Sequence, residues 1–303
     1  MSELNIHEIL INCKTLKPQD FIIDDIKWKH LVRGVIRAKN IMLIGDSGSG
    51  KTKTAQVLAK ALNKNYFYFN LGACQDARST LIGNVQFGKE KGTYFNESSF
   101  IKAIKTENSI ILLDEITRCH PDGWNILLSV LDNSQRYVRL DEKENTEIIN
   151  VANNVTFIAT ANVGPAYTST RTLDRAILDR FLVIEIDSLS QEQEYSLLQL
   201  KFPLVDSKIL KHISTITSHT REIVKSEESK ISNYISTRHA LEMAELAHDG
   251  FTLLEIATTF IYSMFSDEGG ADSERTYIKQ YLQQFLSTNV PEKINTPSTK
   301  LPW

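Results

Sequence analysis

The sequence is poor in cysteine. Its 303 residues include three cysteines, Cys13, Cys74 and Cys119, with no CxxC pair among them. Scattered cysteines in an odd number are typical of reduced thiols in the cytosol and not of a disulfide framework. We therefore expect a cytoplasmic protein whose three thiols stay free.

Long hydrophobic runs are also absent. No stretch approaches the roughly 18 apolar residues that a membrane helix needs. The first ten residues, MSELNIHEIL, lack the basic and apolar regions of a secretory signal. Hydrophobic residues make up 42% of the chain and charged residues 23%, which is ordinary for a globular protein. We expect a soluble protein with no membrane partner.

Positive charge is not in excess either. The formal net charge is −3, so no overall positive field attracts DNA or RNA. A nucleic-acid partner is therefore not favoured. It stays open, because a ring with a basic pore can have a neutral or acidic total charge.

Up to about residue 188, short apolar runs alternate with helical patterns. Five runs are candidate buried strands: residues 41–44, 65–70, 110–113, 155–159 and 182–186. Apolar residues recur at helical spacing in the segments between or before them: residues 21–38, 52–62, 96–106 and 121–131. This alternation predicts an α/β fold, a parallel five-stranded sheet sandwiched by helices.

After residue 188 only helical patterns remain. They cover residues 190–201, 206–225, 236–248, 252–265 and 272–287. We therefore predict an α/β core over residues 1–188 and a small all-helical domain over residues 189–288. The tail, residues 289–303, contains three of the seven prolines and is expected to be extended.

A phosphate-binding motif follows the first predicted strand. The segment matches G-x-x-x-x-G-K-[ST] with Gly45, Asp46, Ser47, Gly48, Ser49, Gly50, Lys51 and Thr52. Glycines allow the tight turn that points successive N–H groups at phosphates, and the N-terminus of the following helix adds partial positive charge. Lys51 is predicted to reach the β and γ phosphates, and the Thr52 hydroxyl to bind Mg²⁺.

A second acidic site ends the predicted strand at residues 110–113. Asp114 follows that apolar run directly, and Glu115 comes next. Mg²⁺ prefers oxygen ligands, so Asp114 at the carboxyl end of a central strand is a candidate to bind the ion or its water. Glu115 points elsewhere and is a candidate to polarise an attacking water.

These two motifs in this order resemble the AAA+ family of ring-forming ATPases. The resemblance implies a P-loop NTPase fold followed by a helical lid domain, with ATP and Mg²⁺ as ligands. It assigns Asn162, after the strand FIATA, to the sensor 1 position that senses the γ-phosphate. It also assigns Arg238, in Ser-Thr-Arg-His, to the sensor 2 position.

The segment LDRAILDRF, residues 173–181, contains two candidates for an arginine that reaches the γ-phosphate of a neighbouring subunit. Arg180 is the first choice by the resemblance, and Arg175 is the second. Such an arginine stabilises charge that develops on the transferred phosphoryl group, so it makes ring assembly a condition for fast turnover.

Two further segments resemble the MoxR-type and dynein-related branch. Residues 72–96 look like an insert in a helix and are expected to be loop-like, with glycines at 83, 88 and 92. Residues 135–151 look like the hairpin placed before sensor 1. Within the insert, Phe87 and Tyr94 could line a pore, although packing under the loop is favoured.

The stretch at residues 161–181 looks particularly like the small AAA+ subunit of cobalt chelatases and its phage and bacterial relatives. This resemblance implies a homo-oligomer, and six subunits in a ring are usual for the family. It also implies a protein partner, which in this group often carries a von Willebrand A domain. Two alternatives stay open on the same core: a nucleic-acid motor or loader, and a GTP-using motor like those of restriction systems.

Overall fold

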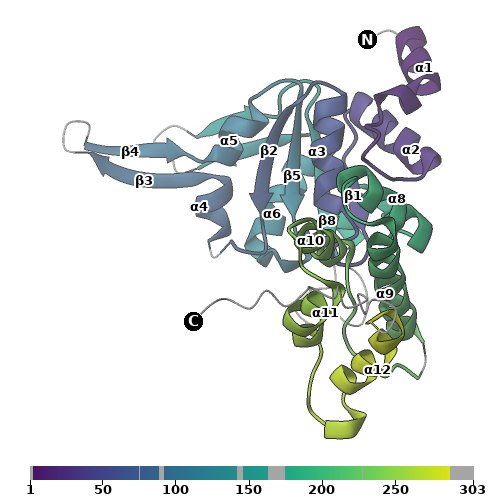
Figure 1. The fold of residues 1–303 in the computed structure, drawn as a ribbon. Helices are drawn as coiled ribbons and strands as arrows, with labels where there is room; N and C mark the ends of the chain where they lie inside the picture. The colour runs from purple at the N-terminus through teal and green to yellow at the C-terminus, as the bar shows by residue number, and fades with distance from the viewer. Residues whose placement is uncertain are drawn as a thin grey trace, which may run out of the picture. The chain divides into compact units, whose positions relative to one another are not determined.

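The computed structural model describes residues 3–74, 76–88, 92–141, 146–162, 175–226 and 228–286. The chain divides into two compact units, Met1–Ser188 and Leu189–Trp303, which we describe one at a time (Figure 1). Several segments named above fall outside the described residues: the tail, most of the stretch at 161–181, and residues 142–145 of the predicted hairpin.

The first unit is built on a five-stranded parallel sheet with the order β2–β5–β8–β1–β9. Its strands are β1 (Ile41–Ile44), β2 (Asn65–Asn70), β5 (Ser109–Asp114), β8 (Thr156–Ala161) and β9 (Leu182–Glu185). All five lie where the apolar runs predicted strands. The predicted fold class is confirmed.

Alternating residues of the central strands enter two separate cores, because successive side chains of a strand point to opposite faces of the sheet. Ile41 and Leu43 of β1 pack beneath α2 (Asp25–Ile36) and α3 (Lys51–Ala61). Met42, between them, joins the other core. Both faces are therefore covered, which explains why these strands are continuously apolar.

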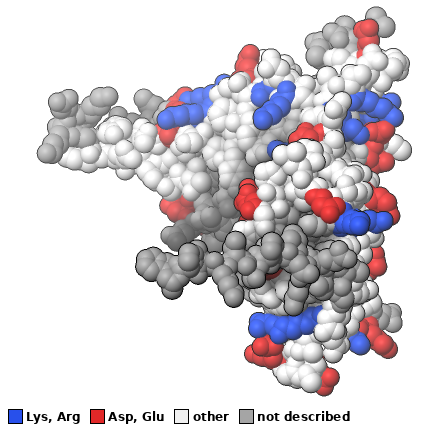
Figure 2. Space-filling view, in the orientation of Figure 1, with Lys and Arg blue, Asp and Glu red and all other residues white. Residues whose placement is uncertain are grey.

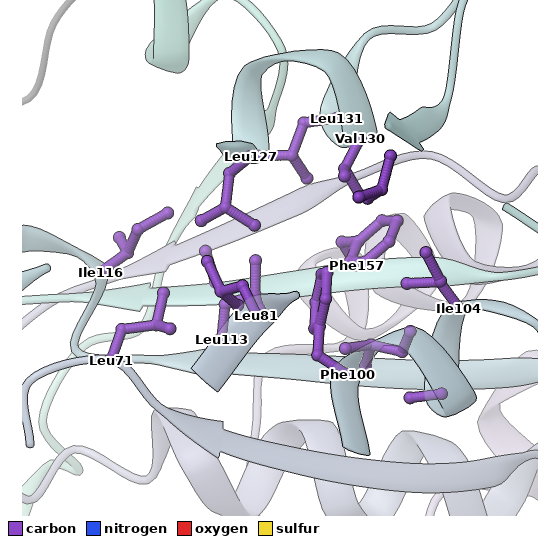
Figure 3. Close-up of a cluster of buried hydrophobic side chains, with 14 of the residues drawn as sticks. Leu71, Leu81, Phe100, Ile104, Leu113, Ile116, Leu127, Val130, Leu131 and Phe157 are labelled. Carbon is purple, nitrogen blue, oxygen red and sulfur yellow. The ribbon is translucent and has the colours of Figure 1, made fainter. Parts of the chain in front are cut away.

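The second of these cores lies under three short helices, α4 (Ala77–Leu81), α5 (Ser99–Ile104) and α6 (Pro121–Leu131). Figure 3 shows Phe100 and Phe157 side by side in it, with Leu127 and Val130 of α6 above the strands. Pro121 begins α6 at a position where its missing N–H costs nothing.

The N-terminal segment forms α1 (Glu3–Ile11) and the 3-10 turn η1 (Cys13–Leu16). The turn is joined to α2 by a buried hydrogen bond of 2.8 Å from Trp28 Nε1 to the carbonyl of Cys13. Asp24 caps α2 by accepting from two of its first N–H groups.

The expectation that residues 72–96 form a loop was wrong. They contain α4 and most of a two-stranded antiparallel hairpin, β3 (Gly83–Gly88) and β4 (Gly92–Glu97), which extends away from the sheet in Figure 1. One hairpin face carries the apolar residues Val85, Phe87 and Phe95, at alternate positions of the two strands. That alternation is a strand signal, and the glycines at the turn obscured it.

The favoured position of Phe87 and Tyr94 was also wrong. Their side chains do not pack under the insert, since Phe87 is 79% exposed and Tyr94 is 40% exposed. The Tyr94 hydroxyl instead donates across the hairpin to Gln86 at 3.1 Å. A two-stranded hairpin has no second layer beneath it, so its outer side chains stay in solvent.

Within the predicted hairpin at 135–151, β6 (Tyr137–Leu140) and β7 (Glu147–Asn150) form a second antiparallel pair. Arg136, just before β6, joins this pair to the rest of the unit. Its guanidinium donates to the carbonyls of Ala38 and Val155, at 3.0 and 2.9 Å. The first unit also contains η2 (Ile116–Arg118) and the short α7 (Arg175–Leu178).

The regular elements in the described part of the second unit are all helices, joined by turns and loops. It contains α8 (Gln191–Lys201), α9 (Ser207–Lys225), α10 (Thr237–His248), α11 (Leu253–Ile256) and α12 (Glu274–Leu286). Its own core includes Leu198, Ile213, Met243 and Ile278. No helix in the described part of either unit is long and apolar enough to cross a membrane.

One helix prediction was too long. Residues 252–265 are α-helical only over α11, then π-helical over Ala257–Ile261 and 3-10 over Tyr262–Met264. Thr258 and Thr259 donate their hydroxyls back to carbonyls of the preceding turn. Such bonds compete with the backbone hydrogen bonds of an α-helix. They are one physical reason why the α-helix does not continue past Ile256.

Two histidines of α9 lie against aromatic rings of α12. His219 stacks on Tyr281 with ring centroids 3.7 Å apart, and His212 lies 5.0 Å from Phe285. One nitrogen of each histidine, His212 Nδ1 and His219 Nε2, is buried without a hydrogen-bond partner in the described structure. Burial lowers the pKa of both rings below the ordinary value.

Acid is therefore expected to destabilise the second unit. A lowered pKa in the folded state means that the unfolded chain binds more protons, so the stability is complete above about pH 6.5 and falls as the pH drops through the lowered folded pKa. Urea unfolding followed by circular dichroism at pH 7.5 and 5.5 measures this fall. The double variant His212→Phe/His219→Phe should reduce it, whereas His30→Gln, at an exposed position, should not.

Candidate nucleotide and magnesium site

The carboxyl ends of three parallel strands bring the candidate residues together. Ile44 at the end of β1 lies opposite Ala161 at the end of β8, and Leu113 of β5 lies opposite Ala159 of β8. The segments that leave these strands carry Gly45, Asp114 and Asn162 in turn. Loops at the carboxyl edge of an open α/β sheet are where such folds bind ligands.

The loop after β1 needs its glycines. Gly45, Gly48 and Gly50 all have positive φ angles, of 146°, 76° and 94°. A Cβ on Gly45 would lie 2.3 Å from the carbonyl oxygen of Ile186, so only glycine fits there. Gly50 precedes the first residue of α3, which starts at Lys51 as predicted. The loop thus leads into a helix N-terminus, where N–H groups are available for an anion.

Polar atoms gather on the inner side of this loop. Lys51 is buried, and its Nζ donates to the carbonyls of Gly45 and Asp46 at 2.9 and 2.7 Å. Ser49 Oγ is buried and has no hydrogen-bond partner in the described chain. Such a buried hydroxyl is rare without a ligand to satisfy it. Ser47 is exposed, and the Asp46 carboxylate accepts from the Ser188 hydroxyl at 3.4 Å.

Asp114 is the centre of a cluster of hydroxyl groups. Thr52 Oγ1 lies 3.2 Å from Asp114 Oδ1 and 3.4 Å from Oδ2, which joins the loop to a strand 62 residues away. Thr160 of β8 donates to Oδ1, and Tyr68 of β2 donates to Oδ2 at 3.1 Å. Burial and the Asp114 carboxylate both raise the pKa of Tyr68, which keeps the phenol protonated and able to donate.

Glu115 lies in an unusual backbone conformation. Its φ and ψ are 55° and 44°, in the left-handed region that non-glycine residues seldom adopt. Its N–H donates to Thr160 Oγ1 at 2.9 Å, and its carboxylate lies 3.4 Å from Arg118 Nη1. A Cβ on Gly72 would lie 2.4 Å from Glu115 Oε2, so Gly72 leaves room for this carboxylate.

Asn162 comes directly after β8 and is partly buried. It is thus held at the sheet edge, next to the strand end that leads into the phosphate loop. Sequence reasoning missed Thr160, Tyr68, Arg118 and Gly72. For Thr160 a signal existed, since it lies on β8 only two residues before Asn162. The other three depend on contacts that the sequence alone does not reveal.

The two arginine candidates differ in their contacts. The Arg180 guanidinium donates to the carbonyls of Leu128 and Ala176 at 3.1 and 2.6 Å, and it lies 3.2 Å from Asp132 Oδ2. Arg175 is exposed, and its side chain makes no hydrogen bond or ion pair with the described residues. Arg180 is thus bound within its own chain, and Arg175 extends into solvent.

Arg238 lies in the second unit, in the first turn of α10. Ser236 caps this helix by accepting from the N–H of His239. Just before Arg238, Thr237 accepts from Arg221 at 3.1 Å. The same Arg221 is buried and forms a 2.6 Å ion pair with the buried Glu194.

The chemistry of these groups fits a nucleoside triphosphate with Mg²⁺. The glycine loop, Ser49 and the helix N-terminus provide hydrogen-bond donors for phosphate. Thr52 and Asp114, whose oxygens lie 3.2 Å apart, would provide two oxygen ligands for Mg²⁺. The described residues contain no cluster of three or more histidine, cysteine or acidic side chains. Two protein oxygens suffice here, because Mg²⁺ in such sites takes its other ligands from phosphate and water.

Comparison with known proteins agrees with this geometry. Residues 40–181 match the model of the AAA domain, dynein-related subfamily. The matched region extends from Asn40, just before β1, to Phe181, just before β9. It therefore covers the phosphate loop, Asp114, Glu115, Asn162 and both arginine candidates.

Similar proteins come from several bacteria. An uncharacterized protein of Staphylococcus saprophyticus is 31% identical over 216 residues, which cover 69% of this chain and 78% of that protein. A putative chaperone, BssE of Thauera aromatica, is 31% identical over 235 residues, covering 77% and 75%. A Lon protease of Lachnoclostridium phytofermentans is 33% identical over 165 residues, which cover 51% of this chain and 18% of that protein.

Replacing Gly45 is expected to damage the loop more than replacing Gly50. Both have positive φ, which costs an alanine roughly 1–3 kcal/mol. Only at Gly45 would the new Cβ also collide with a backbone carbonyl, whereas at Gly50 no atom lies within 4 Å. Urea unfolding of Gly45→Ala and Gly50→Ala, followed by the fluorescence of Trp28 and Trp124 in the first unit, should show the larger loss for Gly45→Ala. Equal losses would contradict the collision.

Proposed function

Because this chain belongs to the AAA family, dynein-related subfamily, we propose that this AAA-family ATPase is a magnesium-dependent ring motor that remodels a protein partner. The observation that carries the proposal is the contact between Thr52 and Asp114. It places a hydroxyl and a carboxylate together beside a loop shaped for phosphates. That is the arrangement a metal-bound triphosphate needs.

In this proposal each residue of the site has its own role in binding or hydrolysis of the nucleotide. Lys51 moves its ammonium group from the loop carbonyls to the β and γ phosphates. Thr52 and Asp114 hold Mg²⁺, which supplies charge neutralisation on the phosphate oxygens. Glu115 accepts a proton from the attacking water, and Asn162 orients that water. The left-handed backbone of Glu115 supports this role, because strained conformations concentrate at functional sites.

We propose Arg175, and not the first choice Arg180, as the arginine that serves a neighbouring subunit. Arg180 would have to break three contacts within its own chain before it could reach outward. Its contacts with Leu128 and Asp132 suit a different role, which is to hold the end of α7 against α6. Arg175 is exposed and would need to break no contact with the described residues. Arg238 is proposed as the sensor 2 arginine on the basis of the family resemblance.

A protein partner is supported by the similarity to a putative chaperone and by the exposed apolar side chains of the β3–β4 hairpin. On the face shown in Figure 2, positive and negative side chains are scattered in small groups, with no broad basic area among the coloured residues. This favours a protein partner over a nucleic acid. The hexamer and the partner with a von Willebrand A domain are proposed from the family resemblance alone. The cytoplasmic location is proposed from the three scattered cysteines.

ATP is proposed as the nucleotide. The residues described above are proposed to bind phosphates and Mg²⁺, which ATP and GTP share, so GTP is the alternative to compare directly. Turnover measured with ATP and with GTP, each with and without single-stranded DNA, tests the three versions of the function together. Faster turnover with GTP, or strong stimulation by DNA that disappears at high salt, would replace the proposal with one of its alternatives.

Glu115→Gln is expected to keep nucleotide binding and lose at least about a hundredfold in turnover, because it removes the proton acceptor and keeps the shape. Lys51→Ala should instead lose binding. Nucleotide binding is measured by fluorescence of a labelled ATP and turnover by phosphate release. Normal turnover in Glu115→Gln would exclude Glu115 as the base.

The two arginines can be compared in the same way. Arg175→Ala should bind ATP as well as the unchanged protein does and lose about a thousandfold in turnover, since a trans arginine acts on the transition state. Arg180→Ala should chiefly lower the melting temperature, because it removes the ion pair with Asp132. Mixing Arg175→Ala with Lys51→Ala subunits should restore part of the turnover in a ring. The reverse pattern would return the role to Arg180.

A further inference from the structure

Tyr68 contacts the candidate magnesium site although no motif points to it. It lies on the edge strand β2, and its phenol donates to Asp114 Oδ2 at 3.1 Å. Its side chain is 47% exposed. A tyrosine this exposed contributes little to the core, so its contact with Asp114 is the feature that needs a reason.

The pairing of β2 with β5 explains how the contact arises. Tyr68 lies opposite Leu112, and Asn70 lies opposite Asp114. These residues are all on one face of the sheet, because positions two apart on a strand share a face. Asp114 is thus two residues further along, about 6.6 Å, which the long phenol can span and a short side chain cannot.

Different hydroxyl groups contact the two carboxylate oxygens of Asp114. Thr160 donates to Oδ1, and Thr52 lies nearer to Oδ1 than to Oδ2. Tyr68 is the closer hydroxyl to Oδ2, at 3.1 Å against 3.4 Å for Thr52. With one oxygen held by Thr160 and the other by Tyr68, the carboxylate cannot rotate freely about its Cβ–Cγ bond.

We propose that Tyr68 is a positioning residue of the magnesium site, which holds the Asp114 carboxylate turned toward Thr52. This inference rests on the proposed function, because it assumes that Mg²⁺ binds there with a nucleotide. Residues that hydrogen-bond a ligating carboxylate set its orientation, and their loss weakens metal binding without removing a ligand. In this proposal Tyr68 acts only through Asp114, to which its phenol donates.

The variant Tyr68→Phe tests this, since it keeps the ring and removes only the hydroxyl. Binding of a fluorescent ATP analogue is titrated with Mg²⁺, and again in EDTA. The expected result is a rise of roughly tenfold in the Mg²⁺ concentration for half-maximal binding. Affinity in EDTA and the melting temperature should stay unchanged. Tyr94→Phe, which removes an exposed hydroxyl on β4, is the matched control and should change none of these values.

The other outcomes are distinct. An unchanged Mg²⁺ requirement in Tyr68→Phe would overturn the inference, provided that binding to the unchanged protein depends on Mg²⁺. Equal weakening in Mg²⁺ and in EDTA would also overturn it, because the phenol would then serve the nucleotide directly. A lowered melting temperature with no change in the Mg²⁺ requirement would make the role structural. If the unchanged protein binds no nucleotide at all, the proposed function fails first.

Discussion

The site depends on the contact between the Thr52 hydroxyl and the Asp114 carboxylate. The two residues are 62 positions apart in the chain, and their side chains meet at 3.2 Å because β1 and β5 flank β8 in one parallel sheet. Parallel strands end at the same edge, so a loop that follows one strand lies beside a carboxylate that ends another. The other features of the site adjoin this contact: the glycine loop leads to Thr52, and the hydroxyls of Thr160 and Tyr68 bind Asp114.

The same site contains two residues with unusual backbone conformations. Glu115 has a left-handed backbone although it is not a glycine. Gly45 has a positive φ, and a Cβ at this position would collide with the carbonyl oxygen of Ile186. The surrounding structure must stabilise both. The Glu115 N–H is held by Thr160, and Gly72 leaves open the space that its carboxylate occupies. A rigid sheet edge thus supports a backbone that an isolated loop would not keep.

The second unit has a polar centre of its own. The buried Arg221 binds Glu194, the carbonyl of Leu189 at the start of the unit, the carbonyl of Ile235 and the hydroxyl of Thr237. A buried ion pair adds little net stability over an apolar pair. Here it ties the first residue of the unit to the start of α10, where Arg238 lies.

The sequence by itself determined the α/β class, all five sheet strands, most helices of the second unit and the glycine loop after β1, because periodicity and glycine spacing are local signals. It could not determine the β3–β4 hairpin, whose alternation is interrupted by glycines, or the exposure of Phe87. Only the tertiary structure revealed Tyr68 beside Asp114 and Gly72 beside Glu115. It also distinguished Arg180, bound to Asp132, from the exposed Arg175. These are contacts between residues distant in the chain, and strand order and register decide them.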